Sequence, residues 1–592
     1  MSKLLLAICS VFFYLLLHAQ TLSFDKNYFQ WPVKLKPAIV ANFGELRPSH
    51  WHMGLDIRTN QKENLPVFAA AGGYISRITV QPFGFGKAIY INHPNGLTTV
   101  YGHLNKFFSA LDSFVTDQQR RNERWEISIR FDKKKFPVHK GQFIGYSGNT
   151  GSSQGPHVHF EIRNTATDRC INPQFFDLGL NDNVSPEFIR LALYNRNQST
   201  YAQQPLLFAI SKTKNGYQLK SDSIIKTGFS KLSFAITAID KISGSNNPNG
   251  IYSARLYVNN QLQSGFVLDS MDYNETNYMN AHIDYPFKIN SGLYLQHLSP
   301  LPGDLGPAYK TGNGIVELND TLVKEIKIEI SDVNRNISCL VFNVQYDDSL
   351  AAAITNKNRE MLAPGRQNEF IRPDFKISFG RNSFYDSVPV TFLKLKKPAN
   401  NAITDAYQFC NDSYPVHESF ELQLKMPAVP EHLRNKIVIS HSGQEFYRKK
   451  ALVNEGWMLA EFNEFGSFQA FIDTTPPVIN DPGKGDTIDL SLANAILFYP
   501  KDESGIGTFR AELNGTWLMF DNDKGNAWRY NFEKSFPYGV HHLKIWVTDI
   551  AGNQLVKQWW FKRNPYIPPK KKAAGKKKTA KHKLKSPGKK EK

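Results

Sequence analysis

The sequence predicts an all-β protein built from several modules. Aromatic residues reach 13%, an excess that is typical of β-rich domains. Short apolar runs alternate with Gly and Pro, and helix-period patterning is nearly absent from the N-terminal part. At roughly 150 residues per domain, a chain of 592 residues corresponds to about four domains. Hydrophobic residues at 41% and charged residues at 21% exclude wholesale disorder and a polytopic membrane protein.

The first residues read as an export signal, and we expect a signal peptide over residues 1–19. Lys3 provides a positive start, Leu4–Leu17 is an apolar run, and the small Ala19 offers a cleavage point. The run is short for a spanning helix, which needs about 20 apolar residues. The mature chain is therefore expected to be exported, periplasmic or extracellular, with no transmembrane segment. An uncleaved N-terminal anchor is the alternative.

Residues 20–182 are expected to form an antiparallel β domain. The Asn95-Gly96 pair is a strong hairpin signal between two of its strands. The runs that read as strands are Val67–Ala71, Gly73–Val80, Lys87–Asn92, Thr98–Leu104, Phe143–Ser147 and His157–Ile162.

An internal repeat follows this domain. Both copies contain an Asp-led turn, a strand ending in Asn, and a closing strand followed by D-x-x-x-N, which is Asp332–Asn336 in the first copy and Asp549–Asn553 in the second. Such turns between regularly spaced strands favour β-sandwiches, and the copies resemble bacterial immunoglobulin-like modules. We therefore expect Ig-like sandwiches over 185–347 and 474–563, with a β-sandwich-like module of less certain type over 365–473.

The C-terminal residues 564–592 are expected to be a disordered, Lys-rich tail. Lys570–Lys592 contains twelve Lys and one Glu, which supply +11 of the net charge of +18. Like charges repel, and nothing apolar is available to bury. The tail is either a solubilising segment or a tether to anionic envelope polymers. Because the chain is expected to be exported, no nucleic acid partner is expected.

Chemistry-bearing residues gather in the first domain as two short patterns. One is His52-Met-Gly-Leu-Asp56 and the other is His157-Val-His159. On a strand, His157 and His159 would point to one face and Val158 to the core. Two imidazoles and a carboxylate suit zinc and leave a fourth position for water, as in catalytic sites. His103, in Tyr101-Gly-His-Leu104, and His157 would then be free for proton transfer or oxyanion stabilisation.

Six motifs in order give these residues a family context. Together they resemble the lysostaphin-type, LytM-like zinc metalloendopeptidases that cut peptide bonds in peptidoglycan, and the match covers about residues 40–175. The motifs are Arg47…His52-x-Gly-x-Asp56, Pro66-Val-Phe-Ala-Ala, Gly84-x-Gly86…Ile91-x-His93, Tyr101-Gly-His-Leu104, Gly141-Gln-Phe-Ile-Gly-Tyr-Ser-Gly-Asn-Thr-Gly151 and Gly155-Pro-His-Val-His-Phe-Glu161.

The resemblance implies an exported zinc endopeptidase acting on peptidoglycan peptides. It implies that His52, Asp56 and His159 bind one zinc ion per chain and that His103 and His157 are the catalytic pair. We assign His157 as general base and His103 as transition-state stabiliser, a division that the sequence leaves open. Two rival hypotheses are a non-catalytic envelope protein of the amidase-activator kind and a secreted peptidase that acts on proteins.

Several further residues have plainer expectations. His50 reads as a loop residue, His93 as a hydrogen-bonding residue of the hairpin, and His139 as exposed. The cysteines after the signal peptide, Cys170, Cys339 and Cys410, read as buried small hydrophobes. Residues 111–136 look like an insertion in the family pattern, with a half-buried strand over Trp125–Phe131. The insertion is either a solvated hairpin or a wall beside the cleft.

Overall fold

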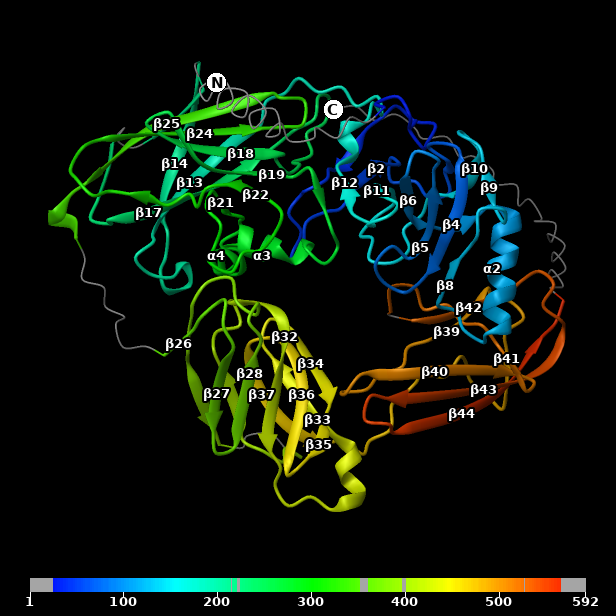
Figure 1. Cartoon of the computed structure of the whole chain (residues 1–592). Coiled ribbons are helices and arrows are strands. Elements are labelled where there is room, and N and C mark those ends of the chain that lie inside the picture. The colour runs from blue at the N-terminus through cyan, green and yellow to red at the C-terminus, as the bar shows by residue number, and fades with distance from the viewer. Residues whose placement is uncertain are drawn as a thin grey trace, which may run out of the picture.

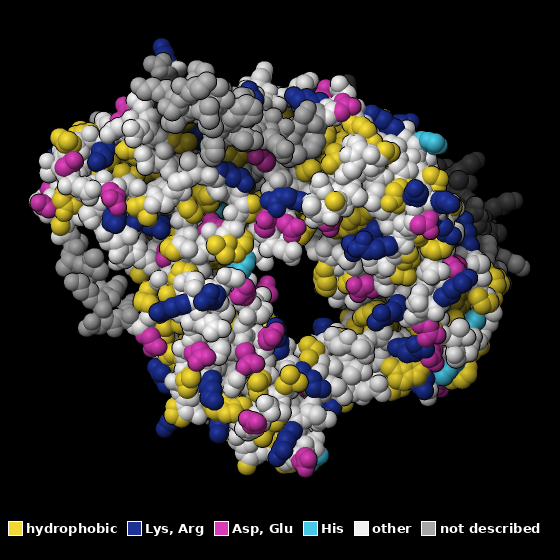
Figure 2. All heavy atoms as spheres, viewed as in Figure 1, with side chains coloured by type: hydrophobic (Ala, Val, Ile, Leu, Met, Phe, Trp, Pro, Cys, Tyr) yellow, Lys and Arg dark blue, Asp and Glu magenta, His cyan; other side chains and the backbone are white. Residues whose placement is uncertain are grey.

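The computed structural model describes residues 25–214, 216–220, 224–351, 360–396, 401–525 and 527–565. In these residues the all-β fold class is confirmed. Four β-rich modules form a ring (Figure 1), and the space-filling view shows an opening through its middle (Figure 2). The predicted signal peptide, and the predicted tail except for its first two residues, lie outside the described part of the chain. No helix of that part is long and apolar enough to cross a membrane.

The first module contains two antiparallel sheets. The larger follows the order β1-β2-β11-β6-β5-β4-β8, with β9 beside β4 and β12 beside β11, and the smaller has the order β3-β10-β7. Their strands are β1 (Ile39–Ala41), β2 (Leu55–Arg58), β3 (Pro66–Phe68), β4 (Gly73–Val80), β5 (Lys87–Asn92), β6 (Leu97–Leu104), β7 (Lys106–Phe107), β8 (Ile127–Arg130), β9 (Pro137–Val138), β10 (Phe143–Tyr146), β11 (His157–Asn164) and β12 (Cys170–Ile171).

The insertion differs from expectation in one element. The predicted strand is present as β8, with alternating burial. However, helix α2 (Ser109–Arg121) precedes it, so the near absence of helical patterning in this region was a wrong prediction. The helix buries Leu111 and Val115, one turn apart, against the core of the module. Phe114 packs beside them on Phe131 and Phe136, but the last turns are polar and bury Gln119, so the apolar period is short and weak in the sequence.

The second module is a large, folded sheet with two short helices. Its helices are α3 (Met279–His282) and α4 (Tyr285–Ser291). Its strands are β13 (Glu187–Asn195), β14 (Leu206–Thr213), β15 (Gly216–Leu219), β16 (Ile224–Thr227), β17 (Lys231–Ile239), β18 (Ser253–Val258), β19 (Gln261–Val267), β20 (Ser270–Met271), β21 (Gln296–His297), β22 (Tyr309–Thr311), β23 (Val316–Glu317), β24 (Lys324–Ser331) and β25 (Ile337–Tyr346). Strand β20 pairs with β12, so this segment of the second module adds a strand to the larger sheet of the first module.

The third module has two five-stranded sheets, β27-β28-β32-β36-β35 and β30-β31-β37-β33-β34, and a pair, β26-β29. Its strands are β26 (Met361–Leu362), β27 (Asn368–Arg372), β28 (Phe375–Phe379), β29 (Val388–Pro389), β30 (Phe392–Leu395), β31 (Ala406–Phe409), β32 (Pro415–Lys425), β33 (Ile437–Ser442), β34 (Phe446–Lys450), β35 (Leu452–Asn454), β36 (Trp457–Glu464) and β37 (Gly466–Ile472).

The fourth module has a five-stranded sheet, β38-β44-β43-β40-β41, and a pair, β39-β42. Its strands are β38 (Thr487–Asp489), β39 (Ala495–Phe498), β40 (Ile506–Leu513), β41 (Thr516–Trp517), β42 (Trp528–Asn531), β43 (Gly539–Asp549) and β44 (Gln554–Arg563). The three cysteines in the described part of the chain are free. Cys170 and Cys410 are buried as predicted, whereas Cys339 is partly exposed, which corrects the expectation for that residue.

The contacts between modules differ in kind around the ring. One continuous apolar core joins the second and third modules and includes Phe43, Trp51 and Met53 of the first. The fourth module contacts the first through hydrogen bonds. The Gly151 N–H donates to Asp523 Oδ1 at 2.8 Å, the Lys524 N–H donates to the Pro82 carbonyl at 2.9 Å, and the Lys524 ammonium donates to the Ser153 carbonyl.

The insertion takes part in this closing contact. Glu123 pairs with Arg510 at 2.7 Å, and Arg120 of α2 pairs with Glu533 at 3.4 Å. The four side chains are between 43% and 63% exposed, so each pair contributes only about 0.2–1 kcal/mol. The insertion is thus a helix and a strand and not a solvated hairpin, and its role as a wall beside the cleft stays a prediction. It is a surface on which the fourth module rests.

We predict that the combined change Asp523→Ala and Lys524→Ala loosens the closing contact. The Gly151 amide loses its carboxylate acceptor, so its hydrogen exchange should accelerate at least tenfold, and small-angle scattering should report a larger radius of gyration. Glu123→Ala is the matched control and should change neither quantity, because it removes one exposed pair. Unchanged exchange at Gly151 in the double variant would contradict this account of ring closure.

Candidate metal centre

The register of three strands places the predicted ligands. In the pairing of β11 with β2, His159 lies directly across from Asp56, and on its other side it lies across from Gly102 of β6. His157 is two residues earlier on the same strand and therefore shares this face. Val158 and Phe160 point the other way and are fully buried in the core, as predicted.

His52 reaches the same point from the loop before β2. The neighbouring Trp51 is buried, and its backbone N–H and carbonyl both bond to the Thr276 hydroxyl of the second module, at 3.0 and 3.1 Å. Gly54 lies between His52 and Asp56 where the chain crosses β11. A Cβ on Gly54 would lie 2.5 Å from the Phe160 carbonyl oxygen and 3.0 Å from His159 Nε2, so only glycine fits.

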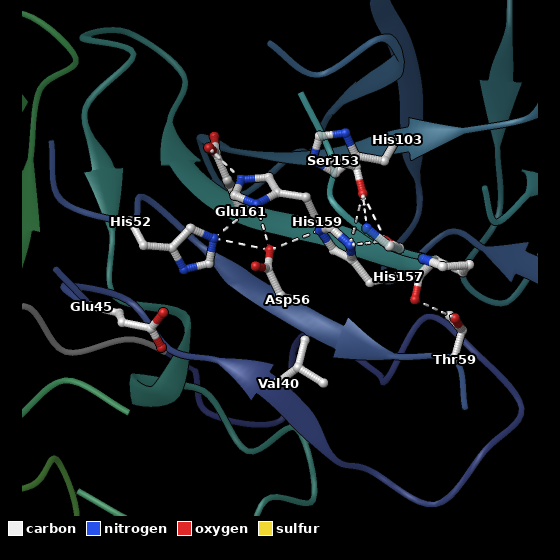
Figure 3. Close-up of polar contacts among 12 residues, drawn as sticks. Val40, Glu45, His52, Asp56, Thr59, His103, Ser153, His157, His159 and Glu161 are labelled. Atoms are coloured by element: carbon white, nitrogen blue, oxygen red, sulfur yellow. Dashed lines mark hydrogen bonds and ion pairs between the residues drawn. The ribbon is translucent and has the colours of Figure 1, made fainter. Parts of the chain in front are cut away.

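The three predicted ligands converge on one point (Figure 3). Asp56 Oδ1 lies 3.0 Å from His52 Nε2 and 3.0 Å from His159 Nδ1, and these two nitrogens are 3.1 Å apart. All three residues are buried. His52, Asp56 and His159 are thus brought together as the sequence predicts.

The second nitrogen of each imidazole shows which atom is available to a metal. His52 Nδ1–H donates to the Asn42 carbonyl at 2.7 Å, because a carbonyl can only accept. His159 Nε2–H donates to Glu161 Oε1 at 2.9 Å. These bonds leave His52 Nε2, and His159 Nδ1 once it has lost its proton, as the two nitrogens that can bind a metal, and both face Asp56. Two neutral imidazole nitrogens and a carboxylate are a donor set that fits zinc.

The charges of the site follow from burial and from these bonds. Burial raises the pKa of Asp56, but the neighbouring histidines outweigh it and hold the pKa well below its usual range. Arg47 also donates to Asp56 Oδ2 at 2.9 Å. Burial lowers the pKa of His159, yet the bonds to Asp56 and Glu161 raise it to about 9. In the metal-free protein, a proton on His159 therefore occupies the position facing Asp56.

The predicted catalytic pair flanks the ligands. His157 Nε2 lies 3.2 Å from Asp56 Oδ1, and its Nδ1–H donates to the Gly155 carbonyl at 2.8 Å. His103 Nδ1–H donates to the Thr150 carbonyl at 2.7 Å, and its ring centre lies 4.7 Å from that of His157. Burial, followed by repulsion from His157, lowers the pKa of His103 to about 3, so this imidazole is neutral.

Three further residues support the site, Glu161 directly behind His159 and Arg163 and Tyr273 behind Glu161, and they were assigned no role from the sequence. Glu161 is fully buried, and Arg163 donates to its Oε2 at 2.6 Å. Burial alone would raise the pKa of Glu161, but Arg163 outweighs it and lowers the pKa to about 2. The hydroxyl of Tyr273, from the second module, donates to Oε1 of the same carboxylate. Glu161 lies within a quoted motif, whereas no local signal marks Tyr273.

The three histidines for which a structural role was expected, His50, His93 and His139, have that role. His50 is exposed on a loop, and His139 is exposed. His93 bonds to the Gly72 carbonyl at 2.9 Å and to Thr99 at 2.9 Å, which is the structural role that the hairpin predicted.

Comparisons with known proteins match a family model to the residues that contain this site. Residues 50–120 and 127–173 match the model of peptidase family M23, and residues 359–473 match a Zu5-like domain. The chain is 33% identical over 112 residues to the DD-carboxypeptidase/endopeptidase Mpg of Neisseria meningitidis, covering 19% of this chain and 20% of that protein. It is 29% identical over 159 residues to the peptidoglycan DD-endopeptidase ShyA of Vibrio cholerae, covering 25% of this chain and 31% of that protein.

One of the similar solved structures covers a comparable share of the chain. The catalytic domain of lysostaphin from Staphylococcus simulans is 25% identical, with 22% of this chain and 86% of that chain covered and a TM-score of 0.17. The curated relatives are thus matched over less than a third of their own length. The gap at residues 121–126 between the two matched segments falls within the insertion that meets the fourth module.

We predict that Tyr273→Phe weakens zinc binding about tenfold, the lower end of the effect of partners that orient a metal ligand. Loss of the hydroxyl leaves Glu161 Oε1 with fewer donors, so His159 is held less firmly. Competition with a chromophoric chelator measures the affinity. Tyr257→Phe removes another Tyr–Glu hydrogen bond of the second module and is the control. Equal affinities in the two variants would refute the positioning role of Tyr273.

We also predict a pH dependence of zinc binding. At pH 7 the metal-free His159 is protonated, whereas burial lowers the pKa of His52 and Asp56 is already ionised. Zinc binding should therefore release about one proton at pH 7, and its apparent affinity should rise about tenfold per pH unit up to about pH 9. Calorimetry in buffers of different ionisation enthalpy counts the protons. Zero protons released at pH 7 is the contrary result.

Proposed function

Because the N-terminal module is a peptidase family M23 domain, we propose that the chain is a zinc metalloendopeptidase that hydrolyses peptide bonds in the stems or cross-bridges of peptidoglycan. The observation that carries the proposal is the convergence of His52 Nε2, His159 Nδ1 and Asp56 Oδ1, with His157 and His103 beside them. We propose one zinc ion per chain at this point.

The chemistry divides between the metal and the histidines. When bound, zinc supplies a Lewis acid that polarises the scissile carbonyl and lowers the pKa of water to near 7. His157 presents a lone pair at Nε2, because Nδ1–H is committed to the Gly155 carbonyl. The Asp56 carboxylate at 3.2 Å stabilises the imidazolium that forms when His157 accepts a proton. These contacts support His157 as the general base.

The contacts of His103 favour a role other than the expected one. Its Nδ1–H is committed to the Thr150 carbonyl, so the neutral ring presents a lone pair at Nε2. Donation to an oxyanion would need a second proton, which burial and the neighbouring histidines oppose. We therefore propose that His103 accepts a hydrogen bond from the attacking water and orients it, instead of stabilising the transition-state oxyanion.

The substrate class and the location rest on similarity and on sequence. ShyA is named a peptidoglycan DD-endopeptidase and Mpg a DD-carboxypeptidase/endopeptidase, and both support a peptide of the cell wall as substrate. A wall substrate requires the module to act outside the cytoplasm, in agreement with the predicted signal peptide. We keep the Lys-rich tail as a proposed tether to anionic envelope polymers.

We predict that two histidines of one strand separate metal binding from turnover. His159→Ala should lose zinc and activity, because it removes one of three ligands. His157→Ala should retain about one zinc per chain and lose at least about 10²-fold in turnover of purified peptidoglycan. Mass spectrometry of the released muropeptides measures activity and identifies the bond, and elemental analysis measures the metal.

The same experiment separates the rival functions. His139→Ala, which changes an exposed histidine of the module, should leave zinc and turnover unchanged. Release of muropeptides would exclude the non-catalytic role. Cleavage of a Gly-rich protein with no release from peptidoglycan would instead support a protein substrate. Equal loss of zinc in the His157→Ala and His159→Ala variants would falsify the proposed division of roles.

A further inference from the structure

Three aspartates meet at the junction of the first and second modules, away from the metal centre. Asp182 lies in the segment between β12 and β13, Asp240 follows β17, and Asp332 follows β24. One oxygen from each lies within 4.8 Å of the others. Asp240 and Asp332 are only 1% and 3% exposed.

Local hydrogen bonds hold two of the three carboxylates and leave one oxygen of the third without a donor. The Ser243 N–H and hydroxyl donate to Asp182 Oδ1 at 2.9 and 3.1 Å. Asn336 donates twice to Asp332, at 2.8 and 2.6 Å. Asp240 Oδ1, in contrast, is buried and has no hydrogen-bond partner. Burial, and then repulsion from Asp332 and Asp182, raises the pKa of Asp240 to about 7.

A fourth oxygen, independent of the acidic cluster, is directed to the same place. Asn249 and Asp240 face each other in an antiparallel bridge and exchange both backbone hydrogen bonds, at 2.9 and 2.8 Å. Side chains of directly opposed residues project from the same side of a ladder. Asn249 is 3% exposed, and its Oδ1 is buried without a partner, while its Nδ2 is used by the Asn247 carbonyl.

The cluster therefore holds unsatisfied acceptors and excess negative charge. Each buried oxygen that lacks a donor costs about 1–3 kcal/mol when dry. The shortfall cannot be met by a further acceptor. A water could donate to these oxygens, but only a cation or a proton also offsets the excess negative charge. The donor set is entirely oxygen, with neither imidazole nor thiolate, which disfavours zinc. Three carboxylates and an amide oxygen supplied from separate loops fit the irregular coordination of Ca²⁺ better than the strict octahedron of Mg²⁺.

We propose that Asp182, Asp240, Asp332 and the Asn249 side-chain oxygen form a Ca²⁺ site. The ion would tie the segment that leaves the first module to two strand ends of the second. The repeat carries a similar triad, Asp473, Asp502 and Asp549, at the junction of the third and fourth modules. There the Ser504 hydroxyl donates to Asp473, and no buried oxygen of the triad lacks a partner in the described part of the chain. The proposal is therefore limited to the first triad.

The test uses the full chain loaded with zinc and freed of calcium on a chelating resin. Wild-type protein titrated with CaCl₂ should bind Ca²⁺ with a dissociation constant of about 10⁻⁵ to 10⁻³ M and should melt several degrees higher when saturated. Asp240→Asn should bind one Ca²⁺ fewer. Without Ca²⁺ this variant should melt above the wild type, because the substitution removes a repelling charge, and Ca²⁺ should raise its melting temperature less.

Matched variants keep the result interpretable. Asp304→Asn changes another aspartate of the second module whose pKa burial raises to about 7, and it should bind Ca²⁺ as the wild type does. Asn249→Ala and the partly exposed Asp182→Asn should each weaken binding at least tenfold, and they serve if Asp240→Asn does not fold. Wild-type affinity in all three site variants, or no Ca²⁺ bound by the wild type, would overturn the proposal. An equal response to MgCl₂ would overturn the assignment to calcium.

Discussion

The pairing of β2 with β11 is the constraint on which the candidate site depends. It sets Asp56 opposite His159 and leaves His157 on the same face, while the next strand places Gly102 against His159. Because side chains alternate along a strand, a slip of one residue would turn both histidines into the core and bring Val158 and Phe160 to the cleft. The full burial of those two apolar side chains makes that slip costly. The hydrophobic core therefore fixes the geometry of a polar site.

The site is not complete within the module that carries its ligands. The second module orders the His52 loop through Thr276 and Trp51, and it supplies the Tyr273 hydroxyl to the carboxylate behind His159. The continuous apolar core and the β12–β20 pairing keep these groups in place. Partners outside a metal's own ligands commonly tune its affinity, and here they come from a different structural unit. The second module is thus part of the functional site as well as a neighbour of it.

Sequence reasoning succeeded where the signal is local. Short β-rich runs bounded by Gly and Pro predicted β5 (Lys87–Asn92) and the start of β11, because strand-forming and turn-forming residues are local signals. The motif histidines and Asp56 could be named in advance, since their spacing is itself the signal. Helix α2 was missed because its buried face continues from Leu111 and Val115 to the polar Gln119, so the apolar period covers little more than one turn. The hydrogen bond of Tyr273 to Glu161 and that of Asp523 to Gly151 could not be predicted. Both form between modules that are far apart in the sequence, and no short sequence pattern indicates such a contact.

The closing contact of the ring ties the cleft to the order in which the chain is made. Asp523 stands 372 residues after its partner Gly151, and chains are synthesised and generally fold from the N-terminus. All the ligand residues of the metal centre lie in the first module, so their strands can pair long before the fourth module exists. The loop next to His157 gains these neighbours only after the second, third and fourth modules have been synthesised. Contact of the fourth module with Gly151 therefore follows, in time, the formation of the strands that carry the ligands.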